Sequence, residues 1–147
     1  MLKSEVFLEI YGGVWLILRF CEERGTLSKI ILSDIPFPIH ELFVVSGVPV
    51  GMVRGNHAHK VLHQYLICLE GKVRVALTYK SREESEVTLT SDDQGIHIPP
   101  NTWASQTYLT EESRLLVFTS GEHKPDEYFR SLEAFYEEVV EGYSRPQ

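Results

Sequence analysis

Short runs of alternating or wholly apolar residues, separated by turn-forming residues, occupy most of the chain and are typical of β-strands. The clearest runs are residues 41–48, 72–79 and 114–120. Further strands are expected at 14–20, 27–32, 50–60, 63–71, 86–91, 95–100 and 102–109. About ten short strands in a row predict an all-β sandwich or barrel.

The hydrophobic period changes once, near the end of the chain. Within residues 125–141, apolar side chains recur at spacings of three and four, which is the period of an amphipathic helix. Pro125 and the acidic residues after it are typical of a helix start. We therefore expect a helix over about 125–141, packed against the sheets. The 147 residues suit a single domain, residues 1–147.

Composition narrows the class of protein. Hydrophobic residues make up 43% of the chain and the formal net charge is −7, so no basic surface for nucleic acid is expected. No apolar run approaches the ~18 residues of a membrane span, and the first residues do not form a signal peptide. Cys21 and Cys68 are not spaced as metal ligands, and both follow apolar residues. We expect two buried free thiols and a cytoplasmic location.

Residues 51–71 carry the candidate chemistry. His57 and His59 are two residues apart in a predicted strand, so both imidazoles point to one face. Arg54 lies just upstream and Gln64 just downstream. Two imidazoles beside a cation and an amide are more typical of a functional site than of a hydrophobic core.

The spacing in this stretch runs from Gly51 through His57, His59 and Gln64 to Gly71. It resembles the first cupin motif, G-x5-H-x-H-x3,4-E-x6-G, with Gln64 in place of the metal-binding glutamate. The resemblance implies a cupin jelly roll. The second cupin motif, which carries the third metal histidine, should fall within residues 95–109, where Ala104 and the two residues after it include no histidine. No metal is therefore expected, although His97 could substitute as a ligand.

A wider resemblance covers about residues 22–136. The matching segments occur in the order of the nucleotide-sugar 3,4-ketoisomerases, a group of small WxcM-like cupins: EERG (22–25), DIPFPI (34–39), RGNHAHK (54–60), LHQYLICLEG (62–71), GIHIPPNTW (95–103), LLVF (115–118) and DEYFRSLEAF (126–135). The resemblance implies isomerisation of a dTDP-4-keto-6-deoxyhexose to its 3-keto isomer without cofactor or metal. It further implies a homodimer with edge strands paired between subunits, and a place in aminodeoxysugar synthesis for surface glycans such as lipopolysaccharide O-antigen.

The same resemblance implies roles for individual residues. His59 would be the general base and His57 its partner, with the reverse assignment left open. An imidazole suits the task because its ordinary pKa is about 6.5. Gln64 could hold an imidazole or a sugar hydroxyl. Three cations could bind the pyrophosphate of the substrate, namely Arg54, Lys60 and Arg24. Two further side chains are expected to contact the substrate, namely His97 and Tyr108.

The chain also departs from the family pattern at two places. Family members often carry a tyrosine in the strand before the paired histidines, where this chain has Phe43, Val44, Val45 and Ser46. Many carry a histidine directly after the tryptophan, where this chain has Ala104. These differences keep two alternatives open: a non-catalytic nucleotide-sugar-binding module, and a metal-dependent cupin oxygenase.

Overall fold

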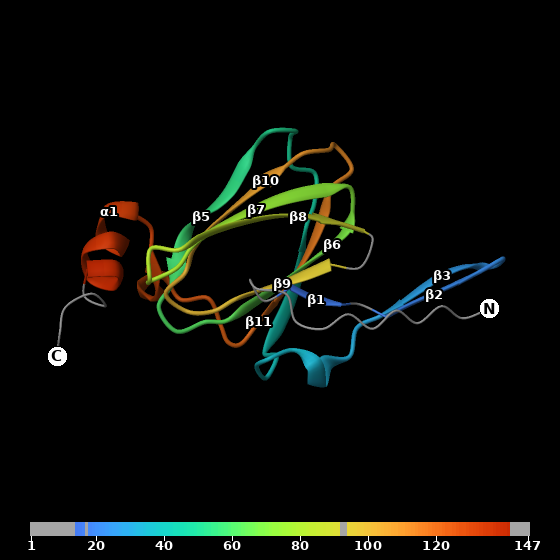
Figure 1. Ribbon diagram of the computed structural model, residues 1–147, viewed down its shortest axis with the longest axis horizontal. Helices are drawn as coiled ribbons and strands as arrows, with labels where there is room; N and C mark the ends of the chain where they lie inside the picture. The colour runs from blue at the N-terminus through green and yellow to red at the C-terminus, as the bar shows by residue number, and fades with distance from the viewer. Residues whose placement is uncertain (1–13, 17, 92–93, 142–147) are drawn as a thin grey trace.

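Two five-stranded antiparallel sheets pack face to face and confirm the predicted all-β sandwich (Figure 1). The fold comes from a computed structural model, which describes residues 14–16, 18–91 and 94–141. The first sheet has the order β1 (Val14–Leu16), β9 (Gln94–Ile98), β6 (Gln64–Glu70), β11 (Arg114–Thr119) and β4 (Glu41–Val45). The second has the order β12 (Tyr128–Phe129), β5 (Val53–His59), β10 (Trp103–Tyr108), β7 (Lys72–Thr78) and β8 (Glu84–Thr90).

The main core lies between the two sheets. Strand β7 shows how alternation builds it, because Val73, Val75 and Leu77 are buried while the residues between them are more exposed. Leu66, Cys68, Val117 and other apolar residues of the first sheet meet them from the opposite side. A second cluster covers the outer face of the first sheet, where Ile35 and Phe37 follow the short 3-10 turn η1 (Leu32–Asp34) and pack on Tyr65, Ile67 and Phe118.

The helix predicted over 125–141 is wrong in its first half. Residues 125–127 form a 3-10 turn, η2 (Pro125–Glu127), and β12 then pairs with the end of β5. Helix α1 (Leu132–Phe135) begins only after Ser131, whose hydroxyl accepts a hydrogen bond from the Ala134 N–H, and it continues as a π-helical segment, η3 (Tyr136–Glu141). Tyr128 and Phe129 are therefore strand residues, because they extend the second sheet.

Strands β2 (Leu18–Glu22) and β3 (Gly25–Lys29) form a separate hairpin that stands away from the sandwich (Figure 1). Every residue of β3 is exposed. Cys21 lies in this hairpin and is exposed, so its predicted burial is wrong, whereas Cys68 is buried as predicted. Among the helices of the described residues, none has the length and apolar character needed to cross a membrane.

A bulge in β5 decides which side chains share its inner face. His57 lies opposite Ala104, but Gly55 lies opposite the very next residue of β10, so Asn56 is the extra residue. Gly55 and Asn56 both have positive φ, at 81° and 53°. Gly55 has no room for a side chain either, because a Cβ would lie 2.8 Å from the Gln106 Oε1 and 2.9 Å from the Ala104 carbonyl oxygen.

Candidate active site

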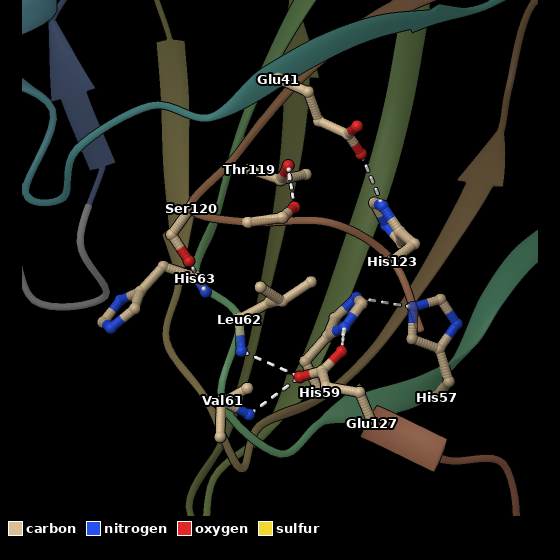
Figure 2. Close-up of polar contacts among 11 residues, drawn as sticks. Glu41, His57, His59, Val61, Leu62, His63, Thr119, Ser120, His123 and Glu127 are labelled. Atoms are coloured by element: carbon tan, nitrogen blue, oxygen red, sulfur yellow. Dashed lines mark hydrogen bonds and ion pairs between the residues drawn. The ribbon is translucent and has the colours of Figure 1, made fainter. Parts of the chain in front are cut away.

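The paired histidines meet at the end of β5, as predicted from their spacing (Figure 2). The His57 Nε2 and the His59 Nε2 are 3.2 Å apart, and the two rings are nearly perpendicular. His59 is 4% exposed, and His57 is half-buried. The two ring nitrogens are close enough to share one proton, which is the arrangement required for proton transfer between them.

Glu127 fixes the orientation of His59 from the other side (Figure 2). Its Oε2 is 2.7 Å from the His59 Nδ1, and its Oε1 accepts hydrogen bonds from the Val61 N–H at 2.8 Å and the Leu62 N–H at 2.9 Å. The backbone adds to this anchor, since the Lys60 N–H donates to the Glu127 carbonyl oxygen. The carboxylate therefore has a single geometry in which one oxygen faces His59.

Electrostatics keeps this group of side chains in one protonation state near neutral pH. Burial, followed by the neighbouring His59, lowers the pKa of His57 to about 4. Burial also lowers the pKa of His59, although its bond to Glu127 opposes that effect. Burial alone would raise the pKa of the Glu127 carboxyl, but hydrogen bonds from His59, Val61 and Leu62 outweigh it and lower that pKa.

Two neutral imidazoles and one carboxylate determine where the protons lie. An ionised carboxylate only accepts hydrogen bonds, so the His59 Nδ1 must carry the proton that lies between them. The Nε2 of His59 then carries the lone pair of that ring and accepts the hydrogen bond that the His57 Nε2–H donates. This tautomer assigns His59, rather than His57, as the stronger candidate for a general base.

Aromatic and charged side chains from three other segments surround the pair. The Tyr128 ring lies 4.7 Å from the His59 ring and 5.0 Å from the His57 ring, centroid to centroid. The His123 ring lies 5.4 Å from the His59 ring, and its Nδ1 is 2.8 Å from the Glu41 Oε1. The Arg130 guanidinium lies 5.0 Å from the centre of the Tyr128 ring.

Three of the predicted binding residues share the inner side of the sandwich with the histidines. The bulge places Arg54 opposite Gln106, on the face that also carries Ala104 and His57. Gln64 is 7% exposed on β6, in step with the core residue Leu66, and its side chain has no hydrogen bond within the described residues. Tyr108 is a core residue, and burial raises its pKa to about 12, so it stays a neutral phenol.

The other three predicted binding residues lie away from the histidine pair. Lys60 follows His59 and lies on the other side of the sheet, where its Nζ sits 4.9 Å from the centre of the Phe129 ring. His97 is on the outer side of the first sheet, with its Nε2 2.9 Å from the His63 Nδ1. Arg24 lies in the β2–β3 hairpin and pairs with Glu22 at 2.6 Å.

Sequence reasoning missed Glu127, His123, Glu41 and Arg130. The sequence pattern places Glu127 among the acidic residues of a helix start and gives His123 no role. They are 68 and 82 positions from their hydrogen-bond partners, so local spacing carries no signal of these contacts. Within the described residues, no three His, Cys, Asp or Glu side chains converge as a metal-ligand set.

A jelly-roll-like β-sandwich with a carboxylate-anchored histidine pair on its inner face defines a cupin-type protein. The family can be named more closely. Residues 14–140 match the family model described as "FdtA: WxcM-like, C-terminal", and the chain belongs to this family.

Individual relatives agree with this family. The chain is 30% identical over 118 residues, 80% of its own length and 84% of the relative's, to the TDP-4-oxo-6-deoxy-alpha-D-glucose-3,4-oxoisomerase of Aneurinibacillus thermoaerophilus. The 3,4-ketoisomerase QdtA of Thermoanaerobacterium thermosaccharolyticum, solved in complex with TDP, is 30% identical with a TM-score of 0.81, covering 92% of this chain and 99% of that one. A 3,4-ketoisomerase from Helicobacter canadensis is 28% identical with a TM-score of 0.78, covering 86% and 95%.

Proposed function

We propose that this protein is a sugar 3,4-ketoisomerase that converts a TDP-4-keto-6-deoxyhexose to its 3-keto isomer. The observation that carries the proposal is the Glu127–His59–His57 chain of hydrogen bonds, which puts the lone pair of His59 on its Nε2. Similarity to the oxoisomerase of A. thermoaerophilus and to QdtA supports the same reaction and substrate class.

The reaction moves one hydrogen from carbon 3 to carbon 4 and one proton from oxygen 3 to oxygen 4. In the proposed mechanism the His59 Nε2 removes the hydrogen on carbon 3 as a proton, and an enediolate forms across carbons 3 and 4. A proton is then delivered to carbon 4, and the ketone is left at carbon 3. Atoms and electrons balance within the sugar, so the step needs no oxidant or reductant. Glu127 stabilises the imidazolium formed on His59, since the two lie 2.7 Å apart.

Two side chains suit substrate binding for different reasons. Arg54 offers a guanidinium that can bind phosphate oxygens in a bidentate manner, and the bulge in β5 puts it on the inner face with His57. Gln64 is a buried amide without a hydrogen-bond partner in the described residues, and a buried amide of this kind needs one. A sugar hydroxyl or carbonyl would satisfy it.

The proposal is tested by incubating the purified protein, after treatment with EDTA, with TDP-4-keto-6-deoxyglucose and following the position of the ketone by NMR. We expect migration from carbon 4 to carbon 3. Micromolar binding of TDP without any migration of the ketone would contradict the proposal that the protein is an enzyme, and it would favour a nucleotide-sugar-binding module. Activity that EDTA abolishes and a divalent metal restores would contradict the metal-free mechanism.

Two variants separate the proposed base from a general loss of structure. His59→Asn should lower turnover by ~10²-fold or more if the imidazole is the general base. His40→Asn is the matched control, because His40 is an exposed histidine outside the site. An equal loss in both variants, or no loss in the first, would remove His59 from this role.

We also propose that two copies associate and that the protein works in the cytoplasm. Strand β4 pairs only with β11 among the described strands, and it exposes Leu42 and Val44, which are 59% and 45% accessible. An open edge with apolar side chains is favourable for pairing with a second chain. Both cysteines are free, as expected in a reducing compartment. A monomeric mass in analytical ultracentrifugation at micromolar concentration would contradict the dimer.

A further inference from the structure

A second histidine–carboxylate pair lies beside the first. The His123 Nδ1 is 2.8 Å from the Glu41 Oε1, which repeats the contact between His59 and Glu127 (Figure 2). His123 belongs to the segment between β11 and β12, whereas Glu41 begins β4. The two pairs are therefore built from three places in the chain, since Glu127 belongs to the same segment as His123, and they converge at one end of the sandwich.

The ring of His123 packs directly beside the histidine pair of the candidate site. Its ring lies 5.4 Å from the His59 ring and is stacked on Tyr128 at 6.0 Å. Its side chain is 28% accessible, so the ring is partly shielded yet still open to a ligand. Within the described residues its Nε2 has no hydrogen-bond partner. His63 and His97 form another close histidine pair on the outer face of the first sheet, and within the described residues no carboxylate is hydrogen-bonded to either ring.

The proposed reaction needs more acid–base groups than one base can supply. Removal of the carbon-3 hydrogen occupies the His59 Nε2. The proton on oxygen 3 must also leave, and oxygen 4 must gain a proton, before the ketone can form at carbon 3. Without that exchange the enediolate returns its negative charge to oxygen 4 and is reprotonated at carbon 3, which regenerates the substrate.

We propose that His123, held by Glu41, is the group that carries the proton from oxygen 3 to oxygen 4. Its Nε2 accepts the proton from the hydroxyl on carbon 3 and gives it to the oxygen on carbon 4, so the imidazole is unchanged at the end of the cycle. Glu41 accepts the Nδ1 hydrogen bond and stabilises the ring while it is charged. This inference rests on the proposed ketoisomerase function.

The two proton movements can be measured separately in deuterium oxide. Loss of the carbon-3 hydrogen signal reports removal by His59, and the new ketone signal reports the complete reaction. His123→Asn should lower ketone migration by ~10²-fold or more while exchange at carbon 3 stays within about tenfold of the wild type. His59→Asn should lower both. The exposed His40→Asn variant should change neither.

Other outcomes overturn the inference in distinguishable ways. Unchanged migration in His123→Asn, or an equal fall in exchange and migration, would exclude a separate relay role. If that variant does not fold, Glu41→Gln provides the same test, with migration expected to fall by about tenfold and exchange retained. Wild-type protein that shows neither exchange nor migration would refute the ketoisomerase function itself, and the relay with it.

Discussion

Replacing Glu127 by glutamine should disable the base while leaving the site in place. Glu127 uses one oxygen for the Val61 and Leu62 N–H groups and the other for His59. In glutamine one of these atoms becomes an NH2 donor. The amide can keep its oxygen on the two backbone groups, or it can turn that oxygen towards His59.

The free-energy cost of each amide orientation decides which one the glutamine adopts. Turning the oxygen to His59 would leave the Leu62 N–H, at a buried residue, without an acceptor, which costs about 1–3 kcal/mol. Keeping the oxygen in place retains the backbone bonds and presents the NH2 group to the His59 Nδ1. That nitrogen must then accept, and the ring proton moves to Nε2, so the basic lone pair is lost. A comparable tautomer change in serine proteases lowers kcat by ~10⁴-fold.

We therefore expect Glu127→Gln to lower kcat by ~10³- to 10⁴-fold with little change in TDP affinity. Ketone migration followed by NMR measures the rate, and ¹⁵N spectra of histidine-labelled protein identify the protonated nitrogen of His59 directly, whatever the activity. Asp126→Asn is the matched control, since it removes an exposed carboxylate one residue away. A kcat within tenfold of the wild type, or a His59 that keeps its proton on Nδ1, would refute the reasoning.

Three further predictions concern pH and the bulge in β5. Because the pKa of His59 is lowered, kcat/KM should stay level down to about pH 6.5 and fall only below it; a pH–rate profile with its acid limb above pH 7 would contradict this. The pKa values of His57 and His97 are about 4 in the folded protein against 6.5, so the unfolded chain binds more protons between these values. The free energy of unfolding should therefore be highest above pH 6.5 and fall towards pH 4, by at most about 3 kcal/mol per histidine. A urea midpoint that stays constant across this pH range would disprove the prediction. Gly55→Ala should destabilise the protein by about 1–3 kcal/mol more than Gly47→Ala, because both glycines have positive φ but only Gly55 would meet atoms within 3 Å; equal losses of thermal stability would show that packing at the bulge is unimportant.

The strand pattern was predictable because alternation is a local property. Strands β4 to β11 all fall within the predicted runs or within two residues of them. The helix start was not predictable from period alone, because Tyr128 and Phe129 satisfy a helical spacing while their backbone extends the second sheet. Their pairing with β5 is a long-range contact, and it outweighs the local preference.

The candidate site shows the same division between local and long-range information. The i, i+2 rule predicts that His57 and His59 share a face, and the same rule puts Lys60 on the opposite face, away from them. Alternation along β9 alone does not say which face is inner, and burial of Ile96 and Ile98 in the core turns His97 outward. Glu127 and His123 reach the site only through the fold, so no spacing in the sequence could predict them.

The docking of β12 on β5 has a consequence for when the contact between His59 and Glu127 can form. A ribosome completes both histidines, the bulge and every strand of the first sheet before it adds Glu127. The sandwich can therefore begin to form around a His59 whose tautomer is not yet fixed, because the carboxylate that fixes it is added later. The proton position on His59 is therefore set only when η2 and β12 have joined the end of β5.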